Sequence, residues 1–220
     1  MPRPPKQPQR TEVEPEDRIY WDRAVRRRTG DPVPEHFQLD PYFGALMASP
    51  PLCAMASELG VFVRNAGNRP RTYTHAQREF IDQVLAVDLK TNIVQRTHIP
   101  DALSAGVRME AIKALRSGQE ELLNDEERLL AKYIRQVMSG TVDDETSLAI
   151  ETLMGSERGL VEYTAFILWL NWIMRMMQAL NTGHVSDEEV EKIIHDLETG
   201  ARPIPDYRVG TSTPESRFDR

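Results

Sequence analysis

The chain has 220 residues, of which 28% are charged and 40% hydrophobic, and its formal net charge is −7. A chain of this length and composition can bury a core of its own, and its acidic balance argues against nucleic-acid binding. The single cysteine, Cys53, excludes an intrachain disulfide and a cysteine-based metal cluster. Its apolar neighbours predict a buried residue rather than a nucleophile.

Residues 1–40 are predicted to form an N-terminal extension that is partly disordered, because the first fifteen are rich in proline and poor in apolar side chains. They contain no apolar stretch of the kind found in signal peptides. A short helix is expected over residues 17–28. The most apolar run, residues 160–180, is interrupted by polar and charged side chains, which favours a buried helix over a membrane span. We therefore expect a cytoplasmic protein that does not associate with membranes.

From residue 41 onward, apolar residues recur at spacings of three and four, which is the period of an α-helix. Thr74, Asn124 and Ser186 have the character of helix N-caps, and Gly106 that of a helix stop. One helix is expected to begin at Leu52 and to end at Gly67 and Pro70. Further helices are expected over residues 75–89, 92–105, 108–116, 125–138, 143–154, 160–180 and 187–197. No segment alternates with the period of a strand, so the predicted fold class is all-α. Residues 183–220 are expected to form a C-terminal helix and an irregular tail.

Two residues on neighbouring predicted helices, Glu79 and His98, are candidates for proton-transfer catalysis. Glu79 follows Arg78, and His98 lies nineteen residues further on. A carboxylate and an imidazole that face each other across a helical core can transfer protons near neutral pH. Structural roles remain open for both, since a lone helical histidine is ordinarily a surface or core residue. Glu79 in a first helical turn would also favour the helix N-terminus by about 0.3–1 kcal/mol.

Several segments occur in an order found in one known family. They are Arg78-Glu79, His98-x-Pro100-x-Ala102, Gly106-Val107, Ile112-x-Ala114-Leu115-x-x-Gly118, Asp125-Glu126-Glu127-Arg128-Leu129-Leu130 and Gly159-Leu160-Val161-Glu162-Tyr163 leading to Leu180-Asn181. With them, residues 43–182 resemble the carboxymuconolactone decarboxylase family, which also contains alkylhydroperoxidase D. The resemblance implies an alkylhydroperoxidase D-like helical bundle over residues 41–182, extended arms on both sides, and a homo-oligomer (dimer, trimer or hexamer).

The chain departs from the redox members of that family, which carry a Cys-x-x-Cys-x-x-x-His element and an upstream glutamate. Alignment on His98 puts Thr91 and Val94 at the two cysteine positions and Glu79 at the glutamate. Without these thiols no dithiol–disulfide cycle can run, so peroxidase activity is disfavoured. The resemblance then implies the lyase-like subset, which uses neither a metal nor an organic cofactor. Many of its members have Tyr-Glu-Trp where this chain has Ile93-Val94-Gln95, so altered substrate contacts are expected.

Other residues are candidates for substrate binding. Arg96 and Arg78 can bind a substrate carboxylate, or form salt bridges instead. Glu162 lies in an apolar helix and must be paired if it is buried, or it braces a subunit contact. Tyr163 and Trp169 can line an aromatic pocket, although aromatics at helical spacing more often belong to a core. No metal site is predicted from the remaining histidines, His36, His75, His184 and His195.

The functional expectation is a cofactor-independent lyase, a decarboxylase, that acts by His/Glu proton transfer inside a closed, dry hollow. Its substrate would be a small carboxylated, lactone or aromatic-derived metabolite. One alternative is a non-catalytic binding or assembly protein on the same scaffold. Another is a hydrolase or isomerase that uses the same pair.

Overall fold

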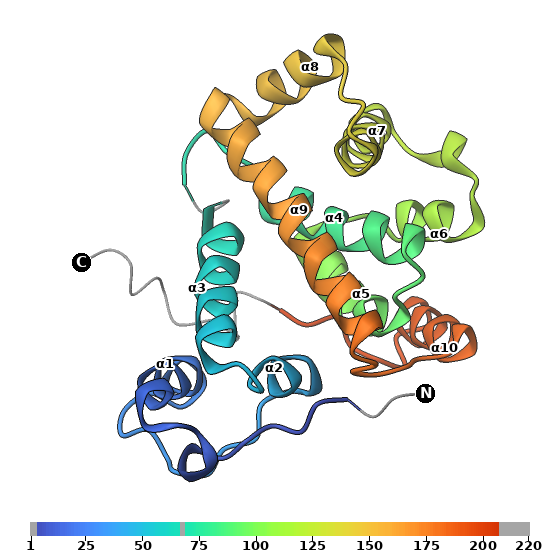
Figure 1. The fold of residues 1–220 in the computed structure, drawn as a ribbon. Coiled ribbons are helices and arrows are strands. Elements are labelled where there is room, and N and C mark those ends of the chain that lie inside the picture. Colours follow the sequence, from blue (N-terminus) through green and yellow to red (C-terminus); the bar gives the residue numbers. More distant parts are fainter. Residues whose placement is uncertain (1–3, 67–68, 207–220) are drawn as a thin grey trace. The chain divides into compact units, whose positions relative to one another are not determined.

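A computed structural model of the protein describes residues 4–66 and 69–206, and over these residues it is helical with no strand (Figure 1). This confirms the all-α class. The α-helices of the first half are α1 (Arg18–Thr29), α2 (Pro41–Leu46), α3 (Pro50–Ala66), α4 (His75–Asp88) and α5 (Asn92–Ala105). Those of the second half are α6 (Met109–Ser117), α7 (Asp125–Ser139), α8 (Asp144–Met154), α9 (Glu157–Ala179) and α10 (Asp187–Glu198). Short 3-10 helices are η1 (Arg10–Glu12), η2 (Pro15–Asp17) and η3 (Glu120–Leu122).

The chain divides into two compact units. The first contains the residues up to Phe62 together with Arg175–His184, and the second contains Val63–Met174 together with the residues from Val185 onward. The divisions fall inside α3, inside α9, and between His184 and Val185, the last of them close to the expected boundary at residue 182. Parts of the predicted arms, residues 1–3 and 207–220, lie outside the described residues, as does the predicted helix end at Gly67.

In the first unit, the described part of the N-terminal segment packs onto its own chain. The side-chain oxygen of Gln7 accepts hydrogen bonds from the Leu39 amide at 2.9 Å and from Gln38 Nε2 at 3.1 Å. The indole nitrogen of Trp21, which is fully buried, donates to the carbonyl of Pro8 at 3.1 Å. From residue 4 onward the segment therefore differs from the predicted disorder. The low apolar content of the segment gave no sign of this packing, because polar groups make these contacts.

Cys53 is fully buried in this unit. Burial, with a contribution from Asp40, raises the pKa of its thiol to about 12. Since the thiolate is the reactive form, this cysteine is inert at neutral pH. The interpretation of Cys53 as a buried apolar residue is confirmed.

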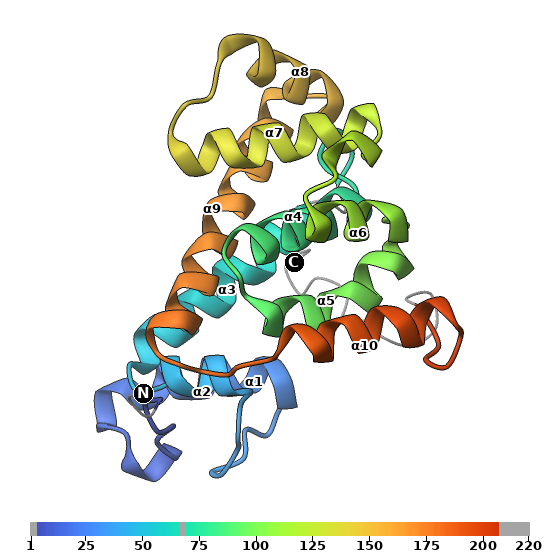
Figure 2. The ribbon, with the colours of Figure 1, turned by 90° about the vertical axis from the view of Figure 1, so that its right-hand side faces the viewer.

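In the second unit, α4 is the central helix, and it packs against α5, α6 and α7 (Figures 1 and 2). Helix α10 packs against α5, and α8 against α7. The three predicted caps are present, because Thr74, Asn124 and Ser186 each form a capping box at the start of a helix. Gly106 ends α5 with φ of 101°, a left-handed conformation that favours glycine.

Within the described residues, no helix is both long and apolar enough to cross a lipid bilayer. The apolar stretch in α9 instead contributes to the core of the second unit. Its residues Phe166, Ile167 and Met174 are fully buried.

Candidate functional site

Helix α4 carries Glu79 into the core of the second unit. The helix begins at His75, so Glu79 is its fifth residue and lies beyond the first turn. A first-turn interaction with the helix dipole, the structural alternative raised by the sequence, therefore does not explain this residue. The side chain of Glu79 is only 1% exposed, and a carboxylate buried to this extent requires partners.

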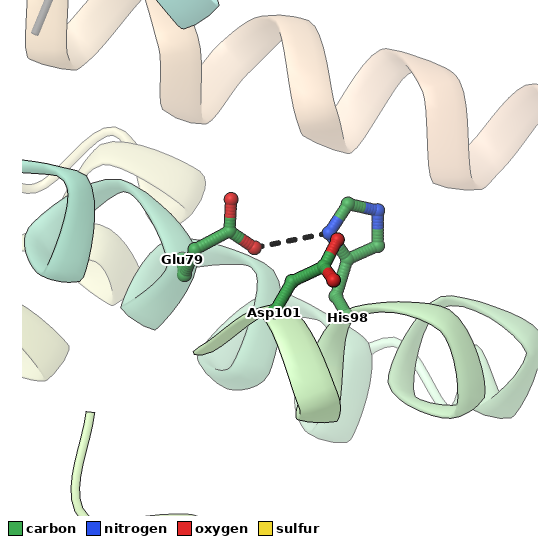
Figure 3. A group of neighbouring side chains, drawn as sticks. All are labelled: Glu79, His98 and Asp101. Carbon is green, nitrogen blue, oxygen red and sulfur yellow. Dashed lines mark hydrogen bonds and ion pairs between the residues drawn. The ribbon is translucent and has the colours of Figure 1, made fainter. Parts of the chain in front are cut away.

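Helix α5 brings His98 to that carboxylate. Only three residues, 89–91, separate α4 from α5, so the two helices run antiparallel as neighbours. The Nδ1 atom of His98 lies 3.0 Å from Oε2 of Glu79, and Figure 3 shows the two side chains facing each other. The pairing expected from the nineteen-residue spacing is present in the structure.

The other oxygen of Glu79 faces two arginines and a histidine. Arg78 donates to Oε1 through Nη2 at 3.1 Å and through Nε at 3.2 Å. The Nε2 atom of His75 lies 3.4 Å from the same oxygen, and Nη1 of Arg64 lies 3.6 Å from it. The carboxylate is thus fixed from one side and presents its second oxygen to His98.

A second buried acid, Asp82, lies one turn further along α4. Its exposure is 0%, and neither carboxylate oxygen accepts a hydrogen bond from a described residue. Oδ2 lies 3.8 Å from Nδ1 of His98, and Oδ1 lies 3.6 Å from Nη2 of Arg64. His98 therefore faces two carboxylates from one helix.

Burial and charge shift the three pKa values in different directions. Burial alone would raise the pKa of Glu79, but the hydrogen bonds from His75 and His98 and the charge of Arg64 lower it well below its usual value. For Asp82 burial prevails, and the pKa is raised. Burial lowers the pKa of His98, yet Asp82 and Glu79 outweigh it and raise the value overall. The arrangement favours an imidazolium beside a carboxylate, which suits proton transfer.

The predicted substrate-binding residues are distributed over different places. Arg78 donates to the Glu79 carboxylate beside His98, whereas Arg96 is exposed on the surface of α5. Glu162 is 7% exposed and is paired with Arg158 at 2.8 Å, as expected for a buried carboxylate in α9. Tyr163 and Trp169 are buried in an aromatic core, where Tyr163 packs on Tyr73 and Tyr133, and Trp169 on Phe166.

Arg64 lies between that aromatic core and the two buried carboxylates, Glu79 and Asp82. Its guanidinium lies over the ring of Phe166, 5.4 Å from the ring centroid, while it approaches both Glu79 and Asp82. Sequence reasoning missed Arg64, which comes from α3, a different part of the chain. It also missed Asp82 and the role of His75. Their signal was present as His75-x-x-x-Glu79-x-x-Asp82, a spacing that aligns three ionisable side chains on one helix face.

The closed, dry hollow expected beside His98 differs from the observed site. The His98 side chain is 19% exposed, so water reaches it. An open pocket of about 630 Å³ lies elsewhere in the second unit, on η3 and α7. It is lined by Glu120, Glu121, Arg128, Lys132, Arg135, Gln136 and Ser139.

One further acid stands close to the pair. Asp101 lies one turn after His98 on α5, and Figure 3 shows its carboxylate next to the imidazole ring. One ligand-type atom each from Glu79, His98 and Asp101 lie within 4.8 Å of one another. Among residues 4–66 and 69–206, these three side chains form a group that could hold a cation.

Comparisons with protein-family models, with curated proteins and with solved structures found no match for this chain.

Proposed function

We propose that the chain is a cofactor-independent lyase, a decarboxylase of the carboxymuconolactone decarboxylase type. It would act on a small carboxylated, lactone or aromatic-derived metabolite. His98 is the proton-transferring residue, and Glu79 holds its imidazole in position.

The observation that carries the proposal is the 3.0 Å contact between Nδ1 of His98 and Oε2 of Glu79. The carboxylate fixes Nδ1 as the protonated nitrogen, which leaves Nε2 for a substrate. Because the His98 side chain is partly exposed while that of Glu79 is buried, a small molecule can reach the imidazole and not the carboxylate.

The proposed reaction needs only proton movement. The carbon–carbon bond to the departing carboxylate breaks, and its electron pair moves into the conjugated carbonyl of the substrate as an enolate. Carbon dioxide leaves as this bond breaks. The imidazolium form of His98, which the raised pKa favours, then gives its Nε2 proton to the carbon and is reprotonated by water. Arg78 already donates twice to Glu79, and Arg96 leaves α5 on a different face from His98, so neither arginine is assigned to the substrate carboxylate.

Peroxidase chemistry of the alkylhydroperoxidase type does not suit this chain. It needs a pair of thiols near His98, and those positions are Thr91 and Val94. The single cysteine is buried in the first unit with a raised pKa.

One observation favours the second candidate function, a non-catalytic binding or assembly protein on the same scaffold. Proton transfer is usually sheltered from water, whereas the imidazole of His98 is 19% exposed. Assembly into a homo-oligomer would cover the exposed part of His98. It would also account for the exposed apolar residues Val161 and Leu168 of α9.

The test is a screen of β-keto acids and carboxylated lactones for carbon dioxide release by the purified protein. The proposal expects turnover that the variant His98→Gln lowers at least a hundredfold. The control His195→Gln removes an exposed histidine of α10 and should keep full activity. Turnover that survives in His98→Gln would contradict the assignment, and absence of turnover across the screen would favour the binding protein.

A further inference from the structure

The residues around the pair also have the character of a metal-binding site. Glu79, His98 and Asp101 contribute one ligand-type atom each, and these atoms lie within 4.8 Å of one another (Figure 3). One imidazole and two carboxylates form a mixed nitrogen and oxygen set, which suits divalent zinc, manganese, iron or cobalt. Metal–ligand bonds of about 2.0–2.2 Å hold ligand atoms roughly 3 Å apart. The observed 3.0 Å between His98 Nδ1 and Glu79 Oε2 agrees with that spacing.

The two oxygens of Glu79 are in different environments. Oε1 accepts hydrogen bonds from Arg78 and lies close to His75 and Arg64, whereas Oε2 faces His98. A ligating carboxylate in a metal site is commonly oriented in this way, with outer groups on one oxygen and the metal on the other. Oε2 is therefore oriented as a ligand before any ion arrives.

Asp82 gives an independent indication that a cation belongs here. It is fully buried, and neither of its oxygens accepts a hydrogen bond from a described residue. Its closest cationic atoms are Nη2 of Arg64 at 3.6 Å and Nδ1 of His98 at 3.8 Å, both beyond hydrogen-bond distance. A buried carboxylate without hydrogen bonds is costly in either protonation state, and a cation beside His98 would offset that cost.

Arg64 and Arg78 already lie beside the carboxylates of Glu79 and Asp82, so a cation enters this cluster by displacing the proton on Nδ1 of His98. The partial exposure of His98 and Asp101 provides an entry path from solvent.

We infer that Glu79, His98 and Asp101 bind one divalent transition-metal ion, with Asp82 as an outer carboxylate. The ion replaces the proton that His98 and Glu79 share. Because the ion takes Nδ1, it leaves Nε2 of His98, the nitrogen that serves the reaction proposed above, without a metal ligand role. The inference rests on the geometry alone and does not depend on the proposed reaction.

The test uses the full-length protein after treatment with a chelator and its removal. Titration with Co²⁺ alone, followed by its visible d–d absorption, is expected to show one bound ion per chain. Asp101→Asn should weaken binding at least tenfold, and His98→Gln should remove the band. The matched controls Asp144→Asn and His195→Gln change exposed residues of α8 and α10, and they should bind as the wild type does.

A measurement on the unmodified chain keeps the inference testable if a variant misfolds. Mn²⁺ should broaden the NMR signals of residues 98–101 before those of α8. The inference is overturned if the wild type binds no ion, or if Asp101→Asn and His98→Gln bind Co²⁺ as tightly as the controls. Neither readout involves a substrate, so failure of the decarboxylase proposal would leave them interpretable.

Discussion

Replacement of Glu79 by glutamine tests how much the buried carboxylate stabilises α4 and α5. Glutamine keeps the shape of the side chain and removes the charge. Hydrogen bonds to a charged group contribute about 1.5–3 kcal/mol, against about 0.5–1.5 kcal/mol for neutral ones. Two residues, His98 and Arg78, lose this advantage, and their side chains are only 19% and 15% exposed, so water screens them little. We expect the free energy of opening to fall by about 2 kcal/mol at neutral pH.

Native-state hydrogen exchange followed by mass spectrometry is the suitable assay, because it reports α4 and α5 separately from the first unit. The direction with pH is fixed by the lowered pKa of Glu79. Its stabilisation is present above the usual value of 4.5 and is lost as the pH falls through the folded-state pKa. The difference between wild type and Glu79→Gln should therefore shrink in acid. Equal protection at neutral pH, or a difference that does not change with pH, would refute the reasoning. Glu145→Gln, an exposed change in α8, is the control.

Three further predictions concern single residues. Asp82→Asn should not lower the free energy of unfolding at neutral pH, because burial raises the pKa of Asp82 and penalises its charge; a loss above about 1 kcal/mol in urea unfolding would contradict this. The pKa of His98, followed by NMR, should lie above its usual value of 6.5, because Asp82 and Glu79 outweigh the effect of burial. The stability that His98 contributes to the fold is fully present below pH 6.5 and is lost as the pH rises through the folded-state pKa. Cys53 should react with a thiol reagent only after unfolding, and rapid labelling of the native protein would show that its burial is wrong.

The sequence predicted those parts of the fold that depend on local signals. The caps at Thr74, Asn124 and Ser186 and the stop at Gly106 satisfy backbone groups within a few residues, so their chemistry can be read directly. The pairing of Glu79 with His98 was also predictable, since it needs only two neighbouring helices with a short link.

The remaining parts depend on tertiary packing that spacing does not determine. Arg64 reaches Glu79 from α3, and no local pattern connects them. The burial of Tyr163 in the aromatic core depends on how α9 is rotated toward Tyr73 and Tyr133. Asp82 shares a helix face with Glu79, but only the packed structure shows that its carboxylate lacks hydrogen bonds.

The most direct test of the central claim, proton transfer by His98 held by Glu79, is solvent-deuterium incorporation into a candidate substrate. The protein is freed of metal, placed in D₂O with a β-keto acid or carboxylated lactone, and followed by proton NMR. The account predicts deuterium at the carbon next to the carbonyl, at a rate that His98→Gln abolishes, Glu79→Gln reduces and His195→Gln leaves unchanged. Incorporation at equal rates in the wild type and His98→Gln would contradict it.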